Sequence, residues 1–196
     1  MNTNAGHEGG TSAETLSPAI PQDIIDAAVS LLQKACDARI AIAAAESCTG
    51  GMLSSLLTDI EGASHIFDRG FVVYSEEAKC ELLGLDRALI DRCGAVSGEV
   101  ARAMAEGALA HSDSTIAVAI TGYAGSAKGA QEAGLVHFAC AAPGLATRHR
   151  EAHFGDIGRG PTRIASLRLA IALLDDAIEL IMRGHERPGK RTAAQP

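Results

Sequence analysis

The amino-acid sequence predicts an α/β protein, a three-layer α/β/α sandwich on a mixed sheet, from three observations. Short apolar runs, typical of buried strands, alternate early in the chain with segments of helical periodicity, which favours parallel strands joined by crossover helices. Two later strand-like runs follow each other around a Pro-Gly turn, which predicts an antiparallel pair added to the same sheet. A long amphipathic helix then covers one face of that sheet.

The early elements begin with a helix at 22–38, QDIIDAAVSLLQKACDA, whose apolar residues recur at helical spacing. The run RIAIAAA at 39–45 is apolar after its first residue, Arg39, as expected for a strand buried on both faces. Helical periodicity returns in MLSSLLTDI at 52–60, after a glycine-containing turn. A β-branched and aromatic run predicts the next strand at 70–74.

Two further helices are predicted by their caps. Ser75 precedes two glutamates and an apolar pattern that stops at Gly84, which marks a short helix between a serine N-cap and a glycine C-cap. Ser97 stands in the same position before the helical segment 98–112.

The second half of the chain alternates strands and loops before it ends in a helix. The apolar run at 114–120 predicts a strand, and 121–134 is a glycine-rich loop with too few apolar residues for a core element. Strands are expected at 135–143 and 147–155. The last helix, at 163–184, opens after a proline and carries its large aliphatic residues on one stripe.

These elements make one domain. We expect residues 21–184 to form it, because a body of this size can bury roughly 70% of its unfolded surface around a single core. Residues 1–20 and 185–196 are polar and lack helical or strand periodicity, so we expect a disordered extension and a disordered tail.

Composition excludes several classes of partner. The formal charge is −7 and aromatic residues make up 3%, so the chain offers neither the basic surface nor the stacking rings of a nucleic-acid binder. The first residues lack a signal-peptide pattern, and no stretch of 18 apolar residues is present, so no membrane association is expected. Five cysteines without a CxxC pair favour reduced thiols and a cytoplasmic location.

Polar groups follow three predicted strands at the points where those strands end. They lie at 46–51, at Tyr74-Ser75 and at 121–125. In open α/β sheets ligands bind beyond the carboxyl ends of the strands, where helix N-termini point at them. The sequence therefore predicts that these three segments converge on one site.

The first of these segments places Ser47, Cys48 and Thr49 side by side. One interpretation is structural: Ser47 or Thr49 caps the following helix. The other is catalytic: a Ser47 nucleophile lies beside unpaired N–H groups that stabilise an oxyanion or bind phosphate, with Lys79 as its base. Cys48 competes as the nucleophile, because a helix N-terminus also lowers the pKa of a thiol.

No metal is assigned from the sequence. His149 and His153 are four residues apart on a predicted strand, where that spacing gives no clear chelate, and no HExxH or CxxC pattern accompanies them. Arg159 and Arg163 lie near the start of the last helix, where the helix dipole disfavours a cation, so an anion is a candidate ligand for either.

Four segments in order resemble one family, the C-terminal domain of CinA, the competence/damage-inducible protein, which also occurs as the stand-alone nicotinamide-nucleotide amidohydrolase PncC. The resemblance runs from about Gln22 to Arg183 and makes the stand-alone form the expectation for this chain. The segments are AESCTGG, FDRGFVVYSEEAK, GAVSGEVARAMAEGAL and AITGYAG.

The resemblance implies hydrolysis of the carboxamide of nicotinamide mononucleotide to nicotinate mononucleotide and ammonia, in pyridine-nucleotide recycling, without metal or other cofactor. By motif position, Ser47 is the nucleophile, Lys79 its base, and Tyr74 belongs to the same catalytic group. The implied substrate-binding positions are Cys48, Thr49, Gly50, Thr121, Gly122, Arg163 and Arg159.

Two alternatives remain open. The family usually has a proline after its ITGxAG segment and later a Lys-Pro-Val-Gly segment, whereas this chain reads GSAKGAQEAGLV. That difference motivates a non-catalytic nucleotide-binding or regulatory module of the CinA type. The other alternative is a thiol hydrolase that uses Cys48. A homo-oligomer is compatible with the sequence, in which no interface is legible.

Overall fold

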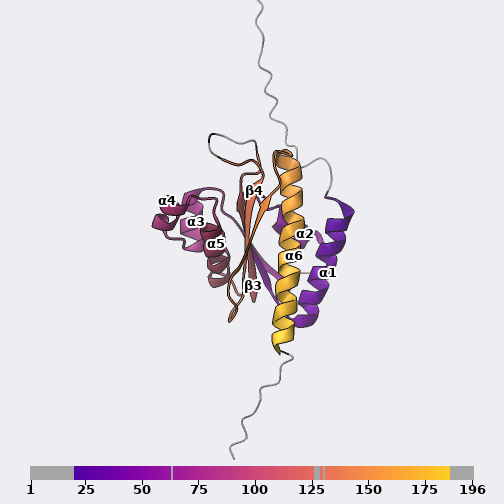
Figure 1. Cartoon of the computed structure of the whole chain (residues 1–196). Helices are drawn as coiled ribbons and strands as arrows, with labels where there is room; N and C mark the ends of the chain where they lie inside the picture. The colour runs from indigo at the N-terminus through magenta and orange to yellow at the C-terminus, as the bar shows by residue number, and fades with distance from the viewer. Residues whose placement is uncertain (1–19, 63, 126–128, 130, 186–196) are drawn as a thin grey trace, which may run out of the picture.

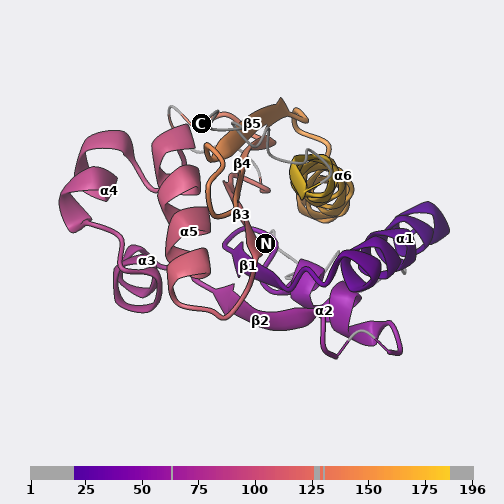
Figure 2. The same ribbon diagram turned by 90° about the horizontal axis from the view of Figure 1, so that it is seen from below.

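The chain folds around a five-stranded mixed sheet with the strand order β2-β1-β3-β4-β5. The structure, a computed structural model, describes residues 20–62, 64–125, 129 and 131–185. Helices cover both faces of the sheet, which Figure 2 shows nearly edge-on between two helical layers. The predicted three-layer α/β/α architecture is therefore confirmed.

The sheet combines a parallel and an antiparallel half. β1 is parallel to both β2 and β3, whereas β3, β4 and β5 pair antiparallel. The carboxyl ends of β1, β2 and β3 consequently lie at the same edge, as the predicted site requires. The strands span Ile42–Glu46 (β1), Phe67–Val72 (β2), Ile116–Gly122 (β3), Leu135–Ala141 (β4) and Arg148–His153 (β5).

The helices divide between the faces. α1, α2 and α6 lie on one side of the sheet and α3, α4 and α5 on the other (Figures 1 and 2). They span Gln22–Ala38 (α1), Met52–Asp59 (α2), Glu76–Leu83 (α3), Arg87–Cys93 (α4), Gly98–Ala110 (α5) and Arg159–His185 (α6).

The two faces of the sheet carry side chains of different size. Toward α1, α2 and α6 the strands mostly present large residues such as Ile42, Ile116 and Phe138. Toward α5 the central strands present alanines, so that helix packs close to the sheet. These alanines, called the alanine face below, are Ala43, Ala45, Ala117, Ala119, Ala139 and Ala141.

Several elements match their predicted bounds. α1 spans the expected residues, and the Ser75 and Ser97 side chains cap α3 and α5 by accepting hydrogen bonds from N–H groups in the first turn. Gly84 ends α3 in the left-handed conformation, as expected. The local cap signals were therefore sufficient to place these helices.

Four elements differ from the prediction by three or more residues or are missing from it. The strand expected at 39–45 is β1, which begins only at Ile42. The strand expected at 70–74 is β2, three residues earlier at its start, because it pairs with β1 from Phe67 onward and the chain leaves the sheet after Val72. α4, capped by Asp86, was not predicted. α6 begins at Arg159 rather than after Pro161, because a proline is tolerated in a first helical turn, where its missing N–H is not needed.

None of the described helices is long and apolar enough to cross a membrane. The extension and tail predicted as disordered, 1–20 and 185–196, lie outside the described residues except for Ile20 and His185.

Candidate active site

The site is built on the turn between β1 and α2, which a buried glutamate holds in place. Glu46, the last residue of β1, is fully buried, and its carboxylate accepts hydrogen bonds from the Leu53 and Ser54 N–H groups at 3.0 and 2.8 Å. It also accepts one from the Ser54 hydroxyl at 2.7 Å. The carboxylate thus caps the N-terminus of α2 from inside the protein.

This arrangement corrects the expected roles of Ser47 and Thr49. The N-cap residue of α2 is Gly51, which makes no side-chain cap hydrogen bond. Thr49 is fully buried, and its hydroxyl oxygen has no hydrogen-bond partner among the described residues. The capping interpretation is therefore wrong for both residues, because Glu46 reaches the helix first.

The same hydrogen bonds limit the amides available to a ligand. The Met52 N–H donates to Thr49 O at 3.3 Å, which leaves the first three amides of α2 all engaged. The Gly50 N–H donates to Ser47 O at 3.1 Å. Gly50 and Gly51 have φ values of 60° and 88°, which favour glycine and shape the turn.

Lys79, on α3, reaches Ser47 beneath the surface. Its side chain is 1% exposed, and its Nζ lies 3.2 Å from Ser47 Oγ, 2.9 Å from Val73 O and 3.5 Å from Ser75 O. Burial lowers the pKa of Lys79 from 10.5, since desolvation disfavours the charged ammonium. The predicted serine and lysine pair is therefore in hydrogen-bond contact.

The three oxygen neighbours of the lysine nitrogen fit either of its protonation states, and an ammonium donates to all three, Ser47 Oγ included. A neutral amine has two N–H donors and one lone pair. The carbonyls of Val73 and Ser75 can accept the two N–H groups, which directs the lone pair at the Ser47 hydroxyl. This geometry allows Lys79 to take the proton of Ser47 Oγ.

Ser47 and Lys79 open onto a cavity of about 370 Å³. Its lining comes from all three predicted segments, so their convergence is as expected. Thr121 is held there by its hydroxyl, which donates to Ala95 O at 2.9 Å. The lining residues are Ser47, Cys48, Tyr74, Lys79, Ala95, Val96, Thr121, Gly122, Tyr123, Ala124, Gly125, Gln131 and Arg159.

The two arginines at the start of α6 have different surroundings. Arg159 lines the cavity, and its Nη2 donates to the Tyr74 hydroxyl at 3.4 Å. Arg163 donates instead to the carbonyl of Thr49, below the turn. Tyr74 is 64% exposed, so this tyrosine and Arg159 form the outer rim of the cavity.

Cys48 differs from Ser47 in its electrostatics. It is 4% exposed, and burial raises the pKa of its thiol to about 12. A thiol with such a pKa stays protonated near neutral pH and is a poor nucleophile. The structure thus favours Ser47 over Cys48.

Some lining residues were not singled out from the sequence. Ala95 and Val96 directly precede the Ser97 cap of α5. Their position beside a helix cap was the available signal. Gln131 comes from the glycine-rich loop and had no such signal.

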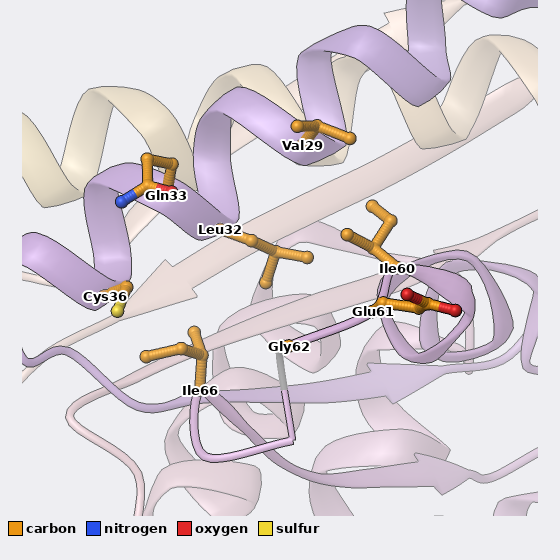
Figure 3. Close-up of a pocket in the computed structure, with 8 residues that line it drawn as sticks. All are labelled: Val29, Leu32, Gln33, Cys36, Ile60, Glu61, Gly62 and Ile66. Atoms are coloured by element: carbon orange, nitrogen blue, oxygen red, sulfur yellow. The ribbon is translucent and has the colours of Figure 1, made fainter.

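A second cavity, of about 190 Å³, lies between α1 and the segment that follows α2 (Figure 3). Its lining is largely aliphatic, with Leu32, Ile60 and Ile66 pointing inward. Near it, Cys36 Sγ is 3.3 Å from His65 Nε2. This cavity is remote in structure from Ser47, at the other end of α2.

Comparison with known families identifies the domain. Residues 24–178 match the model of the CinA C-terminal domain. A CinA-like protein of Chlorobium luteolum is 54% identical over 93 residues, which cover 47% of this chain and 22% of that protein. A CinA-like protein of Akkermansia muciniphila is 47% identical over 108 residues, 54% of this chain and 26% of that protein. The chain thus matches about a quarter of the length of these relatives.

Solved structures give the same result over nearly their whole length. The competence/damage inducible protein CihA from Agrobacterium tumefaciens superposes with a TM-score of 0.79 at 39% identity, covering 82% of this chain and 98% of that one. A CinA superfamily protein from Escherichia coli gives 0.74 at 30% identity, covering 84% and 98%. The chain belongs to the CinA C-terminal domain family.

Proposed function

We propose that this protein hydrolyses the carboxamide of nicotinamide mononucleotide to nicotinate mononucleotide and ammonia. The observation that carries the proposal is the buried contact of 3.2 Å between Lys79 Nζ and Ser47 Oγ, at the floor of an open cavity. A buried lysine with a lowered pKa beside a serine hydroxyl is the pairing that an amide-cleaving nucleophile requires.

The proposed reaction uses water as the only co-reactant. Ser47 Oγ attacks the carboxamide carbon while Lys79 takes the hydroxyl proton. The resulting tetrahedral oxyanion collapses, and Lys79 returns the proton to the departing nitrogen, which leaves as ammonia. Water then attacks the acyl-serine ester by the same route, which releases the carboxylic acid and restores the Ser47 hydroxyl.

The oxyanion requires N–H donors close to Ser47. The Gly50 N–H already bonds to Ser47 O, and the α2 amides bond to Glu46 and Thr49. We therefore assign this stabilisation to the backbone N–H of Cys48, the residue that follows Ser47 and lines the cavity.

The cavity suits a mononucleotide. Its volume of about 370 Å³ lies in the range of small-molecule sites. In our proposal Thr121 and Gly122 contact the nicotinamide ring near Ser47. Arg159 at the rim binds the phosphate, and Tyr74 positions the guanidinium group of Arg159. Arg163 acts through the turn: its hydrogen bond to Thr49 O supports the backbone beside the nucleophile.

The decisive test is release of ammonia and nicotinate mononucleotide from nicotinamide mononucleotide. Wild type should release both, whereas Ser47→Ala and Lys79→Met should release neither while they keep the wild-type circular dichroism spectrum. Matched controls are Ser55→Ala, an exposed serine on α2, and Lys34→Met, a lysine that pairs with Asp175 and does not line the cavity. Both controls should keep wild-type turnover.

Two outcomes would change the assignment. Turnover by Ser47→Ala equal to wild type would remove Ser47 from the mechanism. Tight calorimetric binding of the mononucleotide without any product would favour the nucleotide-binding module that the 121–134 loop motivates.

A further inference from the structure

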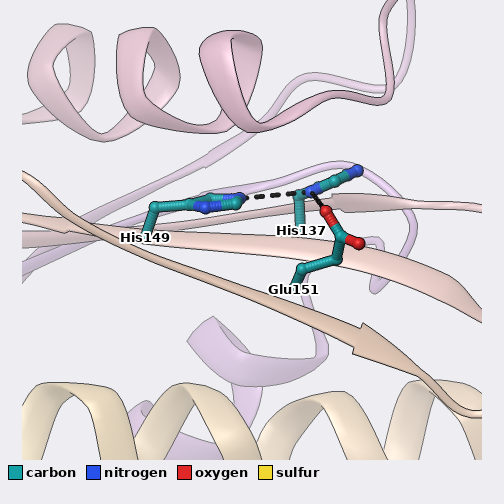
Figure 4. A group of neighbouring side chains, drawn as sticks. All are labelled: His137, His149 and Glu151. Atoms are coloured by element: carbon teal, nitrogen blue, oxygen red, sulfur yellow. Dashed lines mark hydrogen bonds and ion pairs between the residues drawn. The ribbon is translucent and has the colours of Figure 1, made fainter.

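A cluster of three metal-ligating side chains lies on the sheet outside the cavity. His137 of β4 faces the α5 side of the sheet, directly across the ladder from Glu151 of β5, and His149 lies two residues before Glu151 on the same face. One ligand atom of each residue lies within 4.8 Å of the other two. Figure 4 shows the three side chains directed at one another.

The distances in the cluster match the ligand spacing of a tetrahedral ion. His137 Nδ1 is 3.2 Å from His149 Nε2 and 3.4 Å from Glu151 Oε2. Two ligand atoms at about 2.1 Å from a tetrahedral Zn²⁺ are themselves about 3.4 Å apart. The two separations from His137 therefore match that spacing, and the ligand atoms of His149 and Glu151 lie within 4.8 Å of each other.

Hydrogen bonding alone accounts poorly for this convergence. His137 Nδ1 has one in-plane direction, which holds either a proton or a lone pair. A proton there can point at Glu151 or at a lone pair on His149 Nε2, but not fully at both, whereas a lone pair accepts from His149 and faces the carboxylate unfavourably. A cation among the three atoms interacts favourably with all of them.

The surroundings hold the ligands in place. His137 is 6% exposed, and its ring stacks on that of His149 with centroids 5.4 Å apart. The other oxygen of Glu151 lies 2.8 Å from His153 Nε2, and His153 Nδ1 in turn lies 2.7 Å from Glu132. Outer contacts of this kind orient the ligands of metal sites.

The helix above the cluster leaves room for it and contributes both signs of charge. A Cβ at Gly98, the first residue of α5, would lie 2.9 Å from the His149 ring, so only glycine allows the present packing. Glu99 and Arg102 of α5 act on both histidines with opposite effects.

We propose that His137, His149 and Glu151 bind a divalent transition-metal cation of the Zn²⁺ type, with the fourth position open to water. Two imidazole nitrogens and one carboxylate are a donor set that Zn²⁺ uses in proteins. The ion joins β4 to β5 beneath the N-terminus of α5, and His137 is the ladder partner of Thr121, which lines the cavity. The site therefore stabilises the wall of the cavity without contacting Ser47.

The test uses protein stripped of metal and dialysed against Zn²⁺, followed by elemental analysis and a titration. Wild type should bind one equivalent with micromolar affinity or better. His149→Gln and Glu151→Gln should each weaken binding by at least about tenfold, since each removes one ligand atom. Glu151 is exposed, so its variant is expected to fold normally.

The control is His65→Gln, which breaks a pair of potential ligand atoms elsewhere in the fold, His65 Nε2 and Cys36 Sγ. It should bind like wild type. Zn²⁺ should also raise the melting temperature of wild type and of the His65 variant, and at the same Zn²⁺ concentration should raise that of Glu151→Gln by less.

Absence of stoichiometric binding by wild type would overturn the proposal, as would equal affinity in wild type and both ligand variants. These readouts do not depend on amide hydrolysis, so a failure here is distinguishable from a failure of the proposed function.

Discussion

Replacement of Glu46 by alanine should destabilise the protein substantially, because its carboxylate is the cap of α2. The change removes the acceptor of three hydrogen bonds, from Leu53 N–H, Ser54 N–H and the Ser54 hydroxyl. A buried donor left without a partner costs about 1–3 kcal/mol, and loss of a helix cap costs about 1 kcal/mol. Relief of a buried charge offsets part of this, so we expect a loss of about 3 kcal/mol in the free energy of unfolding.

Urea denaturation measures this loss. With a slope of about 2 kcal/mol per molar urea, the midpoint should fall by about 1.5 M. Glu46→Gln keeps one acceptor oxygen and should lose about half as much. Glu81→Ala, at an exposed position of α3, is the matched control and should stay within about 0.5 kcal/mol of wild type. Equal midpoints for the Glu46→Ala and Glu81→Ala proteins would refute the capping role.

Three further predictions concern the site. Burial lowers the pKa of Lys79 from 10.5, and Lys79 must be deprotonated to act as the base. We therefore expect kcat/KM for the mononucleotide to rise with pH through that lowered pKa. A profile that is flat up to pH 10.5 would exclude Lys79 as the base. Cys48→Ala should retain activity within about threefold, since a thiol whose pKa burial raises to about 12 is protonated; an inactive, folded variant would restore the thiol hydrolase hypothesis. Arg159→Met should raise KM at least about tenfold and leave kcat little changed in initial-rate measurements. The reason is that loss of a cation that contacts the bound phosphate weakens binding by at least about 1.4 kcal/mol. An unchanged KM would place the phosphate elsewhere.

Much of the fold was predictable because its signals are local. The N-caps Ser75 and Ser97 and the C-cap Gly84 specify helix ends through atoms only a few residues away. The bounds of β2 were not predictable in the same way, since they depend on its pairing with β1. α4 had a local signal in Asp86, but its short apolar pattern did not stand out.

The site was predictable where the carboxyl ends of parallel strands meet, and less so where one side chain reaches across the structure. Ser47 and Lys79 follow successive parallel strands, so the topology alone brings them together. Glu46 lies at a strand end, yet its role depends on a turn that folds the helix N-terminus back over it. The contact of Arg163 with Thr49 joins residues 114 positions apart and has no local pattern.

The histidine cluster shows the same limit. His149 and Glu151 share a face of the sheet because side chains alternate along a strand. Two ligands two residues apart on a strand therefore lie side by side, as two ligands four residues apart do on a helix. The third member, His137, comes from the neighbouring strand, and its position depends on the register between β4 and β5.

The alanine face gives the protein an indirect means of changing the width of its cavity. α5 rests on methyl groups, and Ala95 and Val96, which precede that helix, form part of the cavity wall. A larger side chain at Ala119 would push α5 outward and carry this wall with it, because cores transmit volume changes to their neighbours. Residues that do not line the cavity thus set its width. Substitutions in the alanine face would widen the cavity while Ser47 and Lys79 stay in place.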